Sequence, residues 1–152
     1  MSENKGENKY RLGLAGEFGV ASELLKRGYN ATVTYGNAKS VDIIVGVSNV
    51  YKTIEVKTAG PYPTTSRKPH IVTGFFQKYG DPDTKHPDYW VLVQVETDLR
   101  SRYFVLTHEQ LGKIQMQRNK MDSWQSVPKG VDNVLLSSLQ EYEDRWDIIE
   151  FK

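Results

Sequence analysis

The sequence predicts a single α/β domain in which a mixed central sheet is flanked by helices. Three observations lead to this fold class. The chain has 152 residues, the length of one ordinary domain, and its 38% apolar and 26% charged residues are typical of globular proteins. An amphipathic segment comes first along the chain and three strand-like runs follow it. The second half then alternates strand-like and helix-like runs, so strands and helices are expected to share one core.

The N-terminal region divides into a polar leader and a helix. Residues 1–11 are polar and charged, so we expect a flexible leader there and a single folded domain over residues 12–152. A helix is predicted over residues 14–27, because apolar residues recur at helical spacing and Gly28 can end it. The apolar residues expected to be buried are Leu14, Phe18, Ala21 and Leu25.

Three strands are predicted next, over residues 31–35, 41–47 and 50–58. Ser48 and Asn49 lie between the last two of these strands and predict a tight hairpin turn. Two segments rich in turn residues are predicted loops, over residues 59–69 and 78–88. A strand is expected between them, over residues 71–76.

The C-terminal half continues with strands and short helices. Strands are predicted over residues 89–95 and 102–106. Thr107 and Gln110 have the spacing of a capping box, which predicts a helix that ends near residue 118. Ser137 and Gln140 predict a second capped, short helix. A final strand is expected over residues 146–151.

Composition excludes several kinds of site. The chain has no cysteine, which excludes a disulfide framework, a cysteine zinc site and a thiol nucleophile. Its 3 histidines are too few for a histidine-rich metal cage. No glycine-rich phosphate loop supports nucleotide hydrolysis. Apolar runs are too short to span a bilayer and the first residues lack a secretory signal, so we expect a cytoplasmic protein.

Charge is distributed unevenly along the chain although the net charge is only +1. Residues 52–129 hold 12 Lys and Arg against 8 Asp and Glu, whereas residues 130–152 hold 2 against 6. This asymmetry allows a surface that faces phosphates on one side of the molecule. Two ordinary solvated faces are the alternative, and charge alone favours that alternative.

Carboxylates and a lysine stand out in the predicted hairpin. Asp42 shares its face of the first strand with Ile44 and Gly46, and Glu55 and Lys57 share a face of the second. We therefore expect Asp42, Glu55 and Lys57 to lie side by side. Charged groups within such apolar segments are costly unless they pair or bind a cation. A hard divalent ion such as Mg²⁺ takes carboxylates together with water and substrate phosphate, which fits this set.

Glu17 is the fourth candidate. On a helical wheel Glu17 lies at the edge of the predicted buried stripe, between Ala21 and Leu24, whereas Glu23 faces solvent. A glutamate that points toward the sheet is an exception that requires an explanation. It is either part of a site with the hairpin carboxylates or a residue at the edge of the core that snorkels to solvent or forms a salt bridge, for which Lys57 is a candidate partner.

These residues resemble the PD-(D/E)XK nuclease superfamily. The resemblance is carried by Gly16-Glu17 on a first helix, Val41-Asp42 at the start of a strand, and Glu55-Val56-Lys57 on the next strand. The branches to which it is most similar are Holliday-junction resolvases and small restriction or intron-homing endonucleases. It covers residues 12–60, and Val41 stands where the family pattern has proline. The resemblance implies a restriction-endonuclease-like αβββαβ core.

The resemblance also implies metal-dependent hydrolysis of DNA phosphodiester bonds. Asp42, Glu55 and the Val56 carbonyl are then expected to hold Mg²⁺, which Mn²⁺ can replace, with Glu17 binding directly or through water. Lys57 is expected to orient or deprotonate the attacking water, or to stabilise charge on the phosphate. The expected partner is double-stranded or branched DNA. A homodimer is expected as well, because one small domain has one active site.

Two other functions remain open. One is a catalytically inactive nucleic-acid-binding module of the same fold, in which Asp42, Glu55 and Lys57 form a structural ion pair. The other is an interaction protein with an unrelated mixed sheet, in which the carboxylates lie far apart.

Several further residues are weaker candidates for contacts with nucleic acid. Gln77 and Lys78 could contact the scissile phosphate, although ordinary surface placement is favoured. Loop residues that could follow a nucleic-acid backbone are Arg67, Lys68, His70, Lys85 and His86. Aromatic residues that could stack on unpaired bases are Tyr62, Tyr79 and Trp124.

Overall fold

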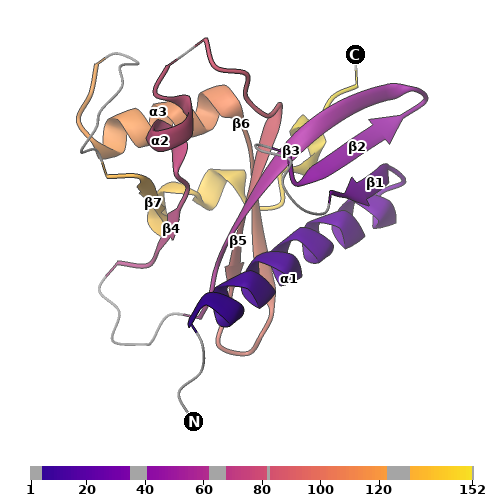
Figure 1. Ribbon diagram of the computed structural model, residues 1–152, viewed down its shortest axis with the longest axis horizontal. Helices are drawn as coiled ribbons and strands as arrows, with labels where there is room; N and C mark the ends of the chain where they lie inside the picture. The colour runs from indigo at the N-terminus through magenta and orange to yellow at the C-terminus, as the bar shows by residue number, and fades with distance from the viewer. Residues whose placement is uncertain (1–4, 35–40, 62–67, 82, 123–130, 152) are drawn as a thin grey trace.

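The computed structural model describes residues 5–34, 41–61, 68–81, 83–122 and 131–151. Its main feature is a five-stranded mixed sheet in the order β1-β2-β3-β5-β6 (Figure 1). β3 and β5 are parallel, and the other neighbouring pairs are antiparallel. A second, two-stranded sheet pairs β4 with β7. The predicted mixed α/β architecture, with a central sheet flanked by helices, is confirmed. Along the chain β4 of the small sheet stands between β3 and α2, so the order αβββαβ holds for α1, α2 and the strands of the large sheet up to β5.

The elements have the following bounds. The helices are α1 (Lys5–Lys26), α2 (Phe75–Tyr79) and α3 (His108–Arg118). The strands of the large sheet are β1 (Asn30–Val33), β2 (Ile43–Val47), β3 (Val50–Ala59), β5 (Tyr89–Val95) and β6 (Ser101–Thr107). The small sheet consists of β4 (His70–Val72) and β7 (Asn133–Leu135). Three short 3₁₀ helices follow at Leu136–Ser138, Gln140–Tyr142 and Trp146–Ile148.

Helices cover both faces of the large sheet, and each face has its own hydrophobic core. On one face α1 packs with Val20 and Leu24 against residues of β2, β3 and β5. On the other face α2, α3 and the small sheet cover Trp90 and Leu92 of β5 (Figure 1). Residues 89–94 of β5 are all buried, and successive residues of a strand point to opposite faces, so β5 is buried on both sides.

Two local predictions are confirmed in detail. Ser48 and Asn49 both have positive φ angles, 47° and 69°, as a two-residue hairpin turn between β2 and β3 requires. Thr107 and Gln110 form the complete capping box of α3, because each side chain bonds the backbone of the other residue. Both features depend on a few adjacent residues, which is why the sequence pattern identifies them.

The prediction for the N-terminal helix was wrong in two respects. Helix α1 begins at Lys5, so residues 5–11 are helical rather than a leader. Lys, Glu and Arg favour helix, and a helix that is nucleated by packing extends through such residues without a buried face. The buried side is also different: Gly16, Val20, Ala21 and Leu24 face the sheet, whereas Phe18 is 47% and Leu25 54% exposed.

Three other predicted elements differ from the structure. The strand expected over residues 71–76 ends at Val72, because Gly74 has a φ of 65° and α2 begins at Phe75. The capped helix expected at Ser137 is a pair of 3₁₀ helices without a side-chain cap. Residues 146–151, expected as a strand, begin with a 3₁₀ helix at Trp146. Among the described helices none has the length and apolar character needed to cross a membrane.

Candidate active site

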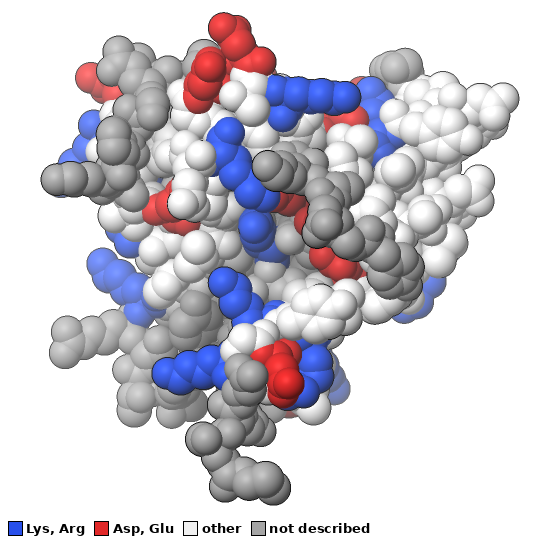
Figure 2. Space-filling view, viewed as in Figure 1, with Lys and Arg blue, Asp and Glu red and all other residues white. Residues whose placement is uncertain are grey.

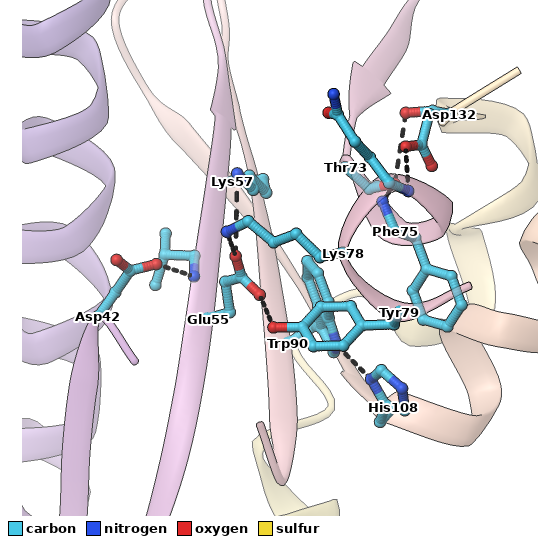
Figure 3. A network of polar contacts seen from close by, with 12 residues as sticks. Asp42, Glu55, Lys57, Thr73, Phe75, Lys78, Tyr79, Trp90, His108 and Asp132 are labelled. Atoms are coloured by element: carbon cyan, nitrogen blue, oxygen red, sulfur yellow. Dashed lines mark hydrogen bonds and ion pairs between the residues drawn. The ribbon is translucent and has the colours of Figure 1, made fainter. Parts of the chain in front are cut away.

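The candidate site lies where β3 extends beyond β2. The pairing of these strands ends at Ile43 and Ile54, whereas β3 continues to Ala59 alongside β5. Asp42, the residue before β2, occupies this edge of β3. Its N–H donates to the Ile54 carbonyl at 3.0 Å, and its Oδ2 accepts the Val56 N–H at 2.8 Å (Figure 3). The end of β2 therefore fixes one carboxylate against the main chain of β3.

Glu17 lies next to Asp42. It projects from α1 as a half-buried side chain, and its carboxyl group lies close enough to that of Asp42 for the two to influence each other's charge. Burial, followed by the charge of Asp42, raises the pKa of Glu17 to about 7. Because its pKa is raised, Glu17 tends to keep a proton, which reduces the repulsion between the two carboxyl groups. A cation bound between them would have the same effect. This pair therefore has the chemistry of a site for a hard cation.

The Glu55 side chain points from β3 toward α2, on the face of the sheet opposite to α1. It is only 2% exposed, and polar groups hold both of its carboxylate oxygens (Figure 3). Lys78 Nζ lies 2.7 Å from Oε1, and the Tyr79 hydroxyl donates to Oε2 at 3.0 Å. Lys57 Nζ is farther away, at 3.8 Å from Oε1. Two lysines and a tyrosine thus compensate the buried charge of Glu55.

Helix α2 brings Lys78 and Tyr79 to Glu55, and Asp132 holds α2 in place. The Asp132 carboxylate accepts the backbone N–H groups of Phe76 at 2.9 Å and of Gln77 at 3.2 Å (Figure 3). Its carbonyl also accepts the Thr73 N–H at 2.9 Å. Sequence reasoning missed Asp132. An N-terminal cap supplied by a distant residue has no local signature that could have identified it.

The structure separates the predicted site residues into two groups. Glu17 and Asp42 are together on the α1 side of β3, and Glu55 and Lys57 are together on the α2 side. The main chain at Val56 lies between the two groups, so the hairpin does not place Asp42 beside the Glu55 side chain as we expected. Among the described residues no three His, Asp or Glu side chains are grouped closely enough to hold a metal ion together.

A groove of about 530 Å³ adjoins the site. The end of β3 forms its floor, and Lys9 of α1 and His70 of β4 line it together with Lys57. Figure 2 shows Lys and Arg side chains running down the middle of the face that contains α2 and the N-terminal end of α1. The described lining residues include basic side chains and no carboxylate, which is suitable for a polyanion.

The weaker candidates have varied positions. Lys78, for which surface placement was favoured, is 41% exposed at its side chain and yet contacts Glu55, whereas Gln77 is exposed. The hydroxyl of Tyr79 is bonded to Glu55 and its ring is buried. His86 stacks on His108 at 3.8 Å between ring centroids. Lys68 and Lys85 are exposed. Tyr62, Arg67 and Trp124 lie outside the described residues.

Comparison with known proteins gives only distant likenesses, and these are to solved structures. No protein-family model matches the sequence, and no curated protein matches it. Among solved structures, the fold is similar to that of a bacterial homing endonuclease, I-Ssp6803I, with a TM-score of 0.48 and 14% sequence identity. The similarity covers 65% of this chain and 64% of that chain, which is less than two thirds of the endonuclease. A likeness this distant assigns neither a family nor an activity.

Proposed function

We propose that this chain is a divalent-metal-dependent endonuclease of the PD-(D/E)XK type that hydrolyses DNA phosphodiester bonds. The observation that carries the proposal is the arrangement at the free edge of β3. There the Glu17–Asp42 carboxylate pair and the Glu55–Lys57 pair lie on either side of one short stretch of main chain. Acidic and basic groups of this kind are needed to bind a metal and to stabilise a phosphate in reaction.

The proposed metal is Mg²⁺, which Mn²⁺ can replace. Asp42 and Glu17 would hold it as the adjacent carboxylates. Glu55 and the Val56 carbonyl, which the resemblance also implies as ligands, are not grouped with that pair among the described residues, so Glu55 would have to exchange Lys78 for the ion. The fit of the metal rests on the proximity of the Glu17 and Asp42 carboxyl groups, which adds to the effect of burial in raising the pKa of Glu17. When bound, the metal supplies Lewis acidity that polarises the phosphate and lowers the pKa of a coordinated water.

The remaining roles belong to side chains of the chain itself. Lys57 would orient the attacking water or stabilise negative charge that develops on the phosphate. Lys9 and His70 line the groove beside Lys57 and would contact the backbone of double-stranded or branched DNA. One chain offers one such site, so cutting of both strands requires a homodimer or two successive encounters.

A cleavage assay with matched variants tests the proposal. Wild type, Asp42→Asn and Glu109→Gln are incubated with supercoiled, linear, single-stranded and four-way-junction DNA in Mg²⁺, Mn²⁺ or EDTA. Asp42→Asn loses a charged ligand and should cut at least about 100-fold more slowly. Glu109 is an exposed residue of α3 paired with Lys113, so Glu109→Gln should cut like wild type. Equal cutting by wild type and Asp42→Asn would contradict the proposed site.

One observation favours the second candidate, an inactive DNA-binding module of the same fold. Lys57, Lys78 and Tyr79 already satisfy Glu55, so its carboxylate forms a complete structural ion pair without a metal. This candidate predicts salt-dependent binding of the same DNAs with no cutting in either metal. It also predicts that Asp42→Asn leaves DNA binding unchanged.

A further inference from the structure

The edge of β3 that extends beyond β2 offers a main-chain donor to the groove. Along β3, alternate residues direct their N–H and C=O groups toward this edge, as the contacts of Ile54 and Val56 with Asp42 show. Thr58 is the next residue of this series and lines the groove. The pairing with β2 ends at Ile54, so among the described strands none pairs with the Thr58 N–H on this side.

Positive charge surrounds this donor. Lys9 of α1 and Lys57 of β3 line the groove, and no carboxylate belongs to its described lining. Lys9 is exposed, so its ammonium group can turn toward a ligand without a change in the fold. A main-chain N–H with ammonium groups beside it is suited to a phosphate oxygen, because a charged acceptor forms the stronger hydrogen bond.

We propose that this edge binds one phosphodiester group of a nucleic-acid strand without a metal ion, through the Thr58 N–H and the Lys9 ammonium group. The groove of about 530 Å³ has the size of a small-ligand site, so it holds one phosphate with its sugar rather than the full width of a duplex. The inference rests on the proposed function for the identity of the ligand as DNA. The binding step itself requires neither a metal nor cutting.

Packing on both sides of β3 fixes the direction of the Thr58 N–H. β5 pairs with β3 as far as Ala59, and the Thr58 side chain lies against Gly16 of α1. Gln94 of β5 donates from Nε2 to the Gly60 carbonyl at 2.8 Å, which holds the chain where β3 ends. A donor that is already held in place loses little freedom when a ligand binds.

Gly13 leaves room for a ligand in the groove. It lines the groove from α1 four residues after Lys9, so the two residues lie on the same side of the helix. A methyl group at Gly13 would meet nothing within 4 Å. A larger side chain at this position should therefore enter the groove without displacing the helix, which provides a way to block the site.

A titration in EDTA, followed through the amide resonances of isotope-labelled protein, tests the proposal. The ligand is a short single-stranded oligothymidylate, and the same oligomer with an uncharged methylphosphonate backbone is its control. The charged strand should shift the Thr58 amide proton downfield, whereas the Val56 amide, which Asp42 already accepts, should shift less. The methylphosphonate strand should bind at least about tenfold more weakly.

Variants of α1 locate the binding site. Gly13→Leu fills the groove and should bind the oligothymidylate at least about tenfold more weakly. Ala15→Leu adds the same side chain at an exposed position outside the described lining, so it should bind like wild type. Lys9→Gln loses one phosphate contact and should bind about threefold more weakly. Thermal unfolding establishes that each variant is folded.

The outcomes separate this inference from the proposed function. An unchanged Thr58 amide, or equal binding by wild type and folded Gly13→Leu, overturns the inference even if wild type cuts DNA with a metal. Equal binding of the two backbones, or the same Thr58 response to inorganic phosphate at equal concentration, overturns the assignment to a charged strand. If Thr58 responds as expected and wild type cuts no DNA in either metal, the inference stands and the proposed cutting alone fails.

Discussion

At the scale of single residues, the surroundings of the buried His108 determine its protonation state. Its Nδ1 accepts a hydrogen bond from Trp90 Nε1 at 3.0 Å, so this nitrogen carries no proton. The ring stacks on Phe75 at 4.8 Å and on His86 at 3.8 Å between centroids. Burial, and to a smaller extent His86, lower the pKa of His108 to about 3. The folded protein therefore keeps His108 neutral at every pH near neutrality.

Replacement of His108 should change how stability depends on pH. The unfolded chain takes up a proton at His108 near pH 6.5, whereas the folded chain does so only near pH 3. The contribution of the buried, neutral His108 to the free energy of unfolding is therefore fully present above pH 6.5, and it declines as the pH falls toward 3. In His108→Asn the amide oxygen can still accept from Trp90 but does not titrate. From pH 7 to pH 5, the free energy of unfolding of wild type should fall by about 2 kcal/mol relative to the variant, as measured by urea unfolding.

The comparison with the variant is necessary because Glu17 acts in the opposite direction. Its pKa is raised from 4.5 to about 7, so the folded chain binds more protons there and gains stability as the pH falls through 7. This contribution is common to wild type and His108→Asn and cancels in their difference. A difference in unfolding free energy that stays constant between pH 7 and pH 5 would contradict the neutral state of His108. His86→Asn, which keeps His108, should retain most of the wild-type dependence.

At the scale of elements, the close approach of α1 to β3 positions Glu17. Gly16 faces Thr58 of β3, and an alanine methyl group there would overlap Thr58 Oγ1 and lie 3.0 Å from Thr58 Cβ. Contacts this short require the helix or the strand to move. The absence of a side chain at Gly16 thus sets the spacing that brings the next residue, Glu17, to Asp42.

Alanine substitutions at two glycines of α1 should have opposite effects on stability. Gly16→Ala creates the overlap with Thr58 and should lower the free energy of unfolding by about 1–3 kcal/mol. Gly13→Ala, in the same helix, meets nothing within 4 Å and should raise it by about 0.5–1 kcal/mol, because alanine favours helix. Denaturant unfolding of the two variants measures both effects. Equal stabilities would show that α1 does not approach β3 this closely.

At the scale of the whole molecule, the groove and the candidate site form one continuous surface. Lys57 belongs to both, since it lines the groove and lies 3.8 Å from Glu55. Lys9 lines the groove from α1 and His70 lines it from β4, so elements from both layers of the molecule meet there (Figure 1). A DNA backbone in this groove would lead directly to the proposed metal site.

Substitution of Lys9 should weaken DNA binding through loss of a phosphate contact. Lys9→Gln is expected to lower affinity at low salt and to reduce the slope of log affinity against log salt by about 0.9. Lys26 lies 17 residues further along α1, roughly 25 Å away along the helix axis, and Lys26→Gln should keep the wild-type slope. Fluorescence anisotropy with labelled DNA over a range of salt concentrations gives both slopes. Identical slopes for wild type and Lys9→Gln would place the DNA elsewhere.

The sequence by itself determined the features that depend on neighbouring residues. The turn at Ser48-Asn49 and the capping box of Thr107 and Gln110 both follow from local backbone chemistry, and the structure contains both. The course of β5 was likewise visible, since a continuous apolar run of β-branched and aromatic residues forms a strand buried on both faces. The mixed α/β fold itself was predicted from the order of the helix-like and strand-like runs along the chain.

Only the tertiary structure decided the surroundings of Glu55. Lys78 is 23 residues away from Glu55 in sequence, and Asp132, which holds α2, is 56 residues from Phe76. The helical wheel also misplaced the buried side of α1, because α1 packs with Gly16 against Thr58, and Phe18 and Leu25 lie on the opposite side of the helix and are exposed. The spacing of apolar residues along the sequence indicates which residues can share a face of a helix or strand. Which face is buried, and which distant groups meet there, is set by packing between elements.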